Sequence, residues 1–307
     1  MEEFSTDSLT EDAVQFLDVS GNLQRIRETA FKFMNMSKEL LVYRFEVAVD
    51  AIKLLDFNAS LGNLLIFDPM NANTLFKKVV CTVIKELGLL SPCVSENQIT
   101  VRTTLTSLPR SRATEVKTYS QLSSCGKGYV CCTGVVVGKT DISKYTQSTR
   151  YICTDSSCEG NEGNHYIRIH VPGALEIETI RKDFKCRFCG QILEEVVSCR
   201  HLSDKMMAEV IPESYLKFNN FSRFKQQIIT LLLRDELTKA LKIGRKYTFI
   251  GIVRKDSYSE RIITAIEVNN ALEDCVSEYA SIPKSIEVYC KHKRRYNIPK
   301  MLAYFFG

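Results

Sequence analysis

The spacing of apolar and polar residues changes character along the chain. Up to about residue 97 most apolar positions follow helical spacing, and a helix that Ser20 or Asn22 could cap is predicted through residue 40. Apolar and polar residues then alternate over Tyr43–Asp50, which predicts a strand with one solvated face. A wide apolar stripe over residues 75–87 predicts a core helix that Gly88 ends in the left-handed conformation. Residues 1–97 are therefore expected to form a helical lobe with one strand.

Beyond residue 97 the pattern indicates β-structure. Short apolar or alternating runs predict strands over residues 99–102, 128–138, 227–233, 247–253 and 261–266. The last two should form a hairpin, a short helix is expected over 235–241, and Gly134 inside a strand indicates a bulge or strong coiling. The predicted fold class is α+β, in which an OB-type β-barrel built from 98–150 and 193–275 follows the helical lobe. An SH3-like barrel would fit the strand content nearly as well.

Two close pairs of cysteines interrupt the predicted barrel. Cys153 and Cys158 are spaced C-x4-C, and Cys186 and Cys189 are spaced C-x2-C. Thiolates are soft donors, and four of them complete a tetrahedral zinc site, so residues 151–192 are expected to form an inserted zinc-binding loop with Zn2+ in a structural role. A redox dithiol at Cys186 and Cys189 is the alternative, but it would need a βαβ context that the sequence lacks. His165, His170 and His201 could replace a cysteine, yet four thiolates already close the site.

Composition supports an intracellular globular protein. The chain has 307 residues, of which 45% are hydrophobic and 25% charged, and this length allows two or three domains. Its 12 cysteines are scattered and no apolar run is long enough to span a bilayer, so we expect a reducing compartment without membrane association. The net charge of +5 permits nucleic-acid binding without requiring it. Much of the positive charge lies in residues 284–300, within a predicted basic linker over 276–307.

Four segments carry a family resemblance. Leu122–Val137 joins a glycine-lysine turn to a G-x-V strand, and Arg150–Cys153 then leads into the first cysteine pair. With Val47–Leu54, Ile99–Arg102 and the stretch from Leu233 to Ile252, these segments resemble the amino-terminal region of the minichromosome maintenance (MCM) family. The resemblance covers most of the chain, and it implies that Ile99–Arg102 enters the barrel.

Departures from the family pattern have their own implication. The proline common after the G-x-V strand is missing from Asp141–Tyr145, and the spacing of the cysteines is irregular. The resemblance is therefore to a divergent member rather than to a replicative helicase subunit. It implies a nuclear protein that acts in meiotic homologous recombination and DNA double-strand-break repair, in gametogenesis, with recombination proteins or MCM-type proteins as partners.

Catalytic motifs are incomplete. Gly138-Lys139-Thr140 looks like part of a phosphate-binding loop, but Gly134 is one position too close and no helix is predicted to follow. Asp235-Glu236 mimics the end of a Walker B strand, although these carboxylates are better placed to begin a helix. We therefore expect no ATP binding and no enzymatic activity, and we expect that an MCM-type ATPase domain would begin about where this chain ends.

A binding function remains, and two segments of the sequence could carry it. Residues 215–225 interleave aromatic and basic side chains, as single-strand-binding platforms do, but Phe218, Phe221 and Phe224 could equally form a core stripe. Residues 291–295 could contact phosphates, act as a nuclear import signal or be a solvated linker. The predicted contacts to single-stranded DNA are Lys217, Arg223, Lys225, Arg254 and Lys255. The alternatives are a protein-interaction scaffold without DNA binding and a truncated subunit of a helicase-type assembly.

Overall fold

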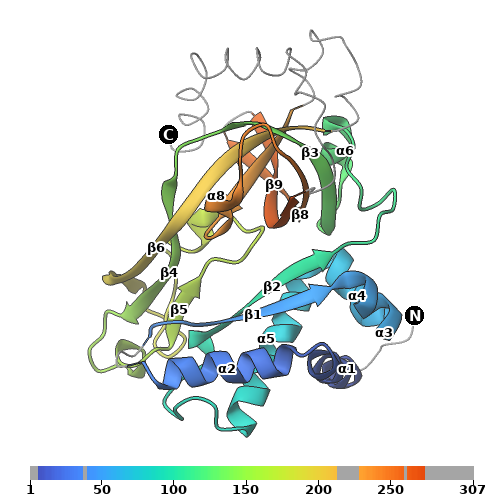
Figure 1. Ribbon diagram of the computed structural model, residues 1–307. Helices are drawn as coiled ribbons and strands as arrows, with labels where there is room; N and C mark the ends of the chain where they lie inside the picture. Colours follow the sequence, from blue (N-terminus) through green and yellow to red (C-terminus); the bar gives the residue numbers. More distant parts are fainter. Residues whose placement is uncertain (1–5, 37–39, 213–227, 259–260, 274–307) are drawn as a thin grey trace, which may run out of the picture. The chain divides into compact units, whose positions relative to one another are not determined.

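The computed structural model describes residues 6–36, 40–212, 228–258 and 261–273. The chain divides into two compact units (Figure 1). The first contains residues 1–107 and 146–202, and the second contains 108–145 and 203–307. Within the described residues no helix is both long and apolar enough to cross a membrane.

Helices and one parallel pair of strands form the first part of the first unit. The elements are α1 (Thr6–Val19), α2 (Asn22–Met34), β1 (Tyr43–Asp50), α3 (Ala51–Phe57), α4 (Ala59–Phe67), α5 (Pro69–Glu86), η1 (Glu96–Gln98) and β2 (Ile99–Ser107). Helices α2 and α5 pack beside the two strands (Figure 1). Along β1 every second residue is buried and the residues between them are half-buried or exposed, as predicted, and Gly88 follows α5 with a φ of 57°. The helical lobe with its strand is therefore confirmed.

Asn22 has a role that the sequence did not reveal. Gly21, with a φ of 72°, is the N-cap of α2, and neither Ser20 nor Asn22 caps it. The side-chain amide of Asn22 instead donates to the backbone oxygen of Ala48 at 2.9 Å and accepts from its backbone nitrogen at 3.1 Å. Asn22 thus pairs with both backbone polar groups of Ala48 on β1. These hydrogen bonds explain why its polar side chain can be only 1% exposed.

Residues 99–107 correct the predicted domain boundary. β2 pairs in parallel with β1, from Tyr43 opposite Ile99 to Asp50 opposite Ser107. The prediction that Ile99–Arg102 enters the barrel was therefore wrong, because this strand completes the helical lobe. An alternating pattern predicts a strand but does not show which other strand it pairs with.

The remaining elements of the first unit surround the four cysteines. They are β4 (Ser143–Cys153) from residue 146 onward, η2 (Glu159–Asn161), β5 (Tyr166–Ile169), η3 (Glu176–Glu178) and the first half of β6 (Leu193–Pro212). β4 and β5 are antiparallel, with Tyr151 opposite Tyr166. Two hydrogen bonds join this part to the helical lobe, from Ser95 Oγ to the backbone oxygen of Asn164 at 3.4 Å and from Asn97 Nδ2 to that of His165 at 2.9 Å.

The second unit has the strand topology of an OB-fold. Its elements are α6 (Tyr119–Ser124), β3 (Tyr129–Lys139), the second half of β6, β7 (Ile229–Arg234), α8 (Leu237–Ala240), β8 (Lys246–Tyr258) and β9 (Arg261–Glu273). Strand pairing runs β3-β8-β9-β7-β6, and β6 pairs again with β3. β7 and β9 are the parallel pair. The same sheet continues past β6 to β4 and β5, so it is not a simple barrel, and the OB-type prediction is confirmed over the SH3-like one.

Two glycines allow the strands of this unit to approach closely. A Cβ on Gly134 of β3 would lie 2.4 Å from the backbone oxygen of Ile211, and one on Gly251 of β8 would lie 2.3 Å from that of Glu267. Register shifts occur between Val136 and Gly138 and between Ile250 and Gly251. The irregularity expected at Gly134 lies a few residues further along β3, and glycine is required at positions 134 and 251 because any side chain would collide with backbone.

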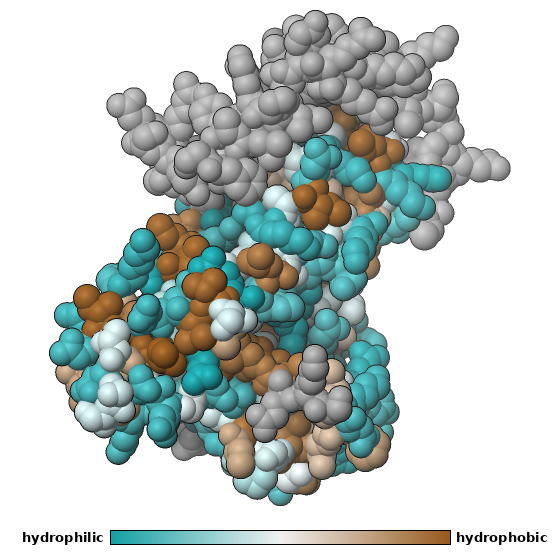
Figure 2. Space-filling model, turned by 90° about the vertical axis from the view of Figure 1, so that its left-hand side faces the viewer, coloured by the Kyte–Doolittle hydropathy of each residue, from teal (hydrophilic) through white to brown (hydrophobic). Residues whose placement is uncertain are grey.

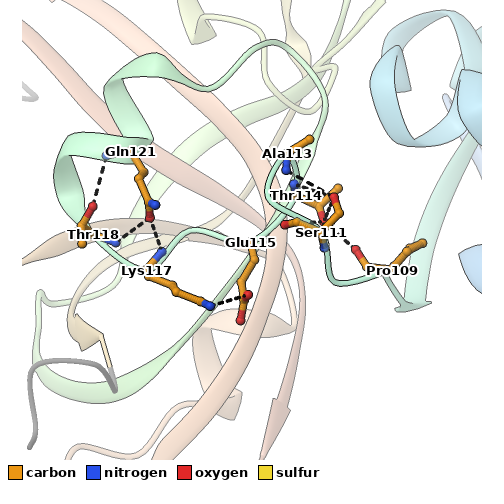
Figure 3. A network of polar contacts seen from close by, with 8 residues as sticks. All are labelled: Pro109, Ser111, Ala113, Thr114, Glu115, Lys117, Thr118 and Gln121. Atoms are coloured by element: carbon orange, nitrogen blue, oxygen red, sulfur yellow. Dashed lines mark hydrogen bonds and ion pairs between the residues drawn. The ribbon is translucent and has the colours of Figure 1, made fainter.

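A hydrogen-bonded segment leads into β3 (Figure 3). Thr118 and Gln121 form a capping box at the start of α6, and Ser111 and Thr114 bond to each other across a tight turn. Thr114 and Val116 then bond to the backbone of Cys131 on β3, at 2.6 Å and 2.8 Å. This segment is held against the strand, and Leu122 of α6 is fully buried in the core of the unit.

Candidate metal centre and nucleic-acid surface

The structure brings the four predicted cysteines together. Cys153 ends β4, Cys158 is the N-cap of η2, and Cys186 and Cys189 lie in the loop before β6. All four sulfur atoms lie within 4.8 Å of one another. The sulfurs of Cys153 and Cys189 are 3.3 Å apart and those of Cys158 and Cys186 are 3.7 Å apart, and all four cysteines are free of disulfides.

These separations suit a single tetrahedral ion. Zinc–sulfur bonds of about 2.3 Å in tetrahedral geometry separate the sulfurs by about 3.8 Å. The cluster contains no carboxylate or histidine, so its donors are the soft thiolates that favour zinc over calcium or magnesium. His165, His170 and His201 lie outside the cluster, as expected. The donor set and its geometry therefore fit a structural metal ion.

Neighbouring groups are arranged around the sulfurs. Asn161 Nδ2 donates to the backbone oxygen of Cys153 at 2.7 Å, and the backbone nitrogen of Gly160 donates to Cys158 Sγ at 3.4 Å. A Cβ on Gly160 would lie 2.7 Å from Cys186 Sγ, so only glycine leaves room for the cluster. Burial raises the pKa of the Cys186 thiol, but the Tyr166 hydroxyl and backbone amides of residues 188 and 189 outweigh it and lower the pKa to about 6. The site thus stabilises a thiolate at this position.

Comparison with known proteins gives the family. Residues 9–108 match the family model described as "MCMDC2, N-terminal domain". The chain is 35% identical over 255 residues to minichromosome maintenance domain-containing protein 2 of Rattus norvegicus, covering 80% of this chain and 37% of that protein. The same protein of Homo sapiens is 35% identical over 251 residues, with 80% and 37% covered. Residues 9–108 therefore carry the amino-terminal domain of this family.

The chain spans little more than a third of these MCM-family relatives. The crystal structure of the N-terminal domain of an archaeal MCM has the same fold, with a TM-score of 0.61 at 13% identity. That likeness covers 88% of this chain and all of the archaeal chain. The fold of an MCM amino-terminal region is thus retained where little sequence identity remains.

The predicted DNA contacts are not gathered in one described place. Lys217, Arg223 and Lys225 lie outside the described residues, as do Phe218, Phe221 and Phe224 and residues 291–295. Arg254 is only 8% exposed, and its guanidinium lies 3.9 Å from the carboxylate of Glu267. Arg254 therefore lies in the interior of the second unit, which corrects its assignment to a DNA-binding surface. Lys255 is exposed, and its Nζ donates to the backbone oxygen of Cys125 at 3.5 Å.

The two short motifs that resemble ATP-binding sequences have structural roles. Gly138 and Lys139 lie within β3, and the backbone nitrogen of Thr140 donates to the oxygen of Met207 at 2.9 Å. Amides used in this way are not available to cradle a phosphate, and β4 rather than a helix follows. Asp235, at a φ of 55°, accepts from the hydroxyls of Tyr145 and Ser203 just before α8. Its carboxylate therefore fixes a turn.

Proposed function

We propose that this chain is a non-catalytic, MCM-like platform that binds single-stranded DNA through its OB unit and holds one structural zinc ion in the cysteine cluster. We further propose that it acts in the nucleus, in meiotic homologous recombination and double-strand-break repair, beside recombination proteins or MCM-type proteins. Its family supports the MCM-like character. The role in recombination extends the family resemblance, and the DNA-binding role rests on a charged surface of the second unit.

That surface is a group of exposed cations at the α8 end of the OB unit, which we call the basic corner. It consists of Lys139 at the end of β3, Lys239 on α8, and Lys242 and Arg245 in the loop before β8. None of the four forms an ion pair with a described residue, whereas Lys85, Lys117, Lys144 and Arg200 do. Uncompensated cations held close together attract a polyanion, because binding releases the counterions of its phosphates.

Backbone contacts hold the basic corner in place. Val136 of β3 donates to the backbone oxygen of Arg245 at 3.1 Å and accepts from Gly244 at 2.8 Å. Lys139 Nζ lies 3.5 Å from the backbone oxygen of Leu241. A neighbouring carboxylate is that of Glu209, which is opposite Gly138 on β6 and 9% exposed. Segments about 100 residues apart in sequence therefore present their cations at one place.

The test is a salt titration of binding to single-stranded DNA. Changing Lys242→Glu and Arg245→Glu together should weaken binding of every sequence tested and flatten the slope of log affinity against log salt by about 1.4, at about 0.7 per lost phosphate contact. The matched control changes Arg27→Glu and Lys32→Glu, two exposed cations of α2, and should leave the slope unchanged. Equal effects of the two double changes would show that net charge, rather than the basic corner, governs binding.

Failure of the unaltered protein to bind DNA would favour the scaffold function instead. One observation supports that alternative. The cysteine-containing part of the first unit exposes Phe188 by 53%, Ile192 by 56% and Val197 by 65%. On the face shown in Figure 2, hydrophobic side chains lie in several groups among hydrophilic ones. Side chains of this kind that form a contiguous exposed patch commonly mark surfaces that bind other proteins.

A further inference from the structure

The side chain of Tyr166 approaches the cysteine cluster from β5. Tyr166 is 6% exposed, and its hydroxyl oxygen lies 3.2 Å from Sγ of Cys186, which is 4% exposed. The same oxygen accepts a hydrogen bond from the backbone nitrogen of Arg187 at 2.8 Å. The phenol is therefore held in place by the packing of its buried ring and by the hydrogen bond from the backbone of Arg187.

These two contacts decide where the hydroxyl proton goes. An amide N–H can only donate, so the phenol oxygen must accept from Arg187. A thiolate can only accept, so in the metal-bound state the hydroxyl must donate to Cys186. We propose that Tyr166 is a positioning residue of the metal centre, whose hydroxyl holds the Cys186 thiolate in place and withdraws charge from it. This inference rests on the proposed metal ion.

The charge of the site explains why such a donor would matter. Four thiolates around one divalent ion carry a net charge of about −2. Cys153 and Cys186 are almost fully buried, so water contributes little to stabilising that charge at these two sulfurs. Hydrogen bonds from fixed donors replace the missing solvent. Removing a group that hydrogen-bonds to a metal ligand typically lowers metal affinity about 10- to 100-fold.

Tyr151 provides a matched control within the same small core. It is 3% exposed and lies opposite Tyr166 in the β4–β5 pair. Its hydroxyl donates to the backbone oxygen of Arg181 at 3.1 Å, and no hydrogen bond to a sulfur is found for it among the described residues. Replacing either tyrosine by phenylalanine removes one buried, hydrogen-bonded oxygen. Only the change at position 166 removes a bond to a metal ligand.

The experiment loads the full chain with zinc and measures its release to an excess of a chromogenic chelator. Tyr166→Phe should release the ion at least about 10-fold faster than the unaltered protein, and Tyr151→Phe should release it at the original rate. Equal acceleration in both variants would overturn the proposal, because it would show a packing effect. A chain that binds no zinc at all would overturn both the proposed metal centre and this inference, whereas zinc binding with equal release rates would overturn only the inference.

Cobalt substitution gives a readout that packing alone would not move. A hydrogen bond lowers the energy of the sulfur lone pair, so losing it should shift the sulfur-to-cobalt charge-transfer bands to longer wavelength in Tyr166→Phe and not in Tyr151→Phe. If Tyr166→Phe fails to fold, the unaltered protein loaded with 113Cd still decides the question. A scalar coupling between cadmium and the Tyr166 hydroxyl proton, transmitted through sulfur, is expected, and its absence in the folded, loaded protein would refute the hydrogen bond.

Discussion

Glu267 accepts a hydrogen bond from Nε of Arg234 at 3.0 Å inside the second unit, where the two side chains are 4% and 6% exposed. The guanidinium of Arg254 lies 3.9 Å from the same carboxylate, and that of Arg234 lies 4.3 Å from the ring centroid of Tyr145. One carboxylate on β9 thus pairs with two buried guanidinium groups, one from each of the flanking strands β7 and β8. Burying charge in this way costs free energy unless every partner stays in place.

Removing that carboxylate should therefore destabilise the OB unit strongly. Glu267→Ala removes the carboxylate that pairs with two buried guanidinium groups, and the free energy of unfolding should fall by about 3–5 kcal/mol. Urea unfolding measures the change, with Glu236→Ala as the exposed control. The triple change Arg234→Met, Arg254→Met and Glu267→Leu, which replaces all three charges by apolar side chains, should recover much of the loss. A loss below about 1 kcal/mol for Glu267→Ala would contradict this account.

The sequence predicts the cysteine cluster correctly and the place of Arg254 wrongly, and the reason is physical. Two short cysteine spacings constrain where four sulfurs can go, whatever the rest of the fold does. Gly88 likewise marks the end of α5 because few other residues adopt its conformation readily. Arg254 is buried because it pairs with Glu267 on another strand. The sequence placed Arg254 beside a predicted hairpin, and that position gives no indication of the partner.

Other contacts left only weak signals in the sequence. Arg234 interrupts an apolar strand and Glu267 lies in another, so an ion pair between them could have been suspected. Asn22 resembles an ordinary helix cap, and nothing nearby indicates its bonds to Ala48 across 26 residues. Tyr166 is one of 13 tyrosines, and only the fold shows that its hydroxyl meets a sulfur.

A second prediction concerns nucleotide chemistry. The backbone amide of Thr140 donates to the backbone oxygen of Met207, so it is not available to bind a phosphate. The purified chain should therefore neither hydrolyse ATP nor unwind a DNA duplex. A coupled phosphate-release assay should give the same background for the unaltered chain and for Lys139→Ala. Turnover that disappears in Lys139→Ala would show that residues 138–140 form a genuine nucleotide loop.

A third prediction follows from Glu195 and its dependence on pH. A hydrogen bond from Arg200 lowers the pKa of Glu195, burial opposes it, and a further hydrogen bond from Thr149 lowers it again. Since the folded pKa lies below the unfolded value of 4.5, this contribution is present above about pH 4.5 and is lost as the pH falls through the folded value. The carboxylate is 17% exposed, so we expect a contribution of up to about 1 kcal/mol.

Substitution separates this effect from general acid denaturation. Glu195→Gln should be less stable than the unaltered chain at pH 7, and the difference should shrink towards pH 3 as Glu195 becomes protonated in the unaltered chain. Its exposed neighbour provides the control, because Glu194→Gln should leave the pH profile of stability unchanged. Identical profiles for all three proteins would rule out the Glu195–Arg200 pair as a source of pH dependence.

The last prediction is that removing the metal disorders one part of the first unit and spares another. Five buried side chains, Tyr151, Cys153, Tyr166, Cys186 and Leu193, form the small core around the sulfurs, and a core of this size holds its fold poorly without a further constraint. The helical lobe has its own core, with Phe45, Leu61 and Phe76 fully buried. Hydrogen exchange after chelation should therefore accelerate over residues 151–192 and stay slow in α4 and α5.

The loop that contains Ser95 and Asn97 should mark the limit of the disorder, because its hydrogen bonds to Asn164 and His165 are lost when the metal-binding loop opens. Cys189→Ser should reproduce the pattern without a chelator, since it removes one ligand while Cys153, Cys158 and Cys186 remain. Cys132→Ser is the control: it lies in the core of the OB unit and should lower stability there while retaining the metal. Exchange that accelerates equally in α5 and in residues 151–192 would mean that the metal supports the whole unit.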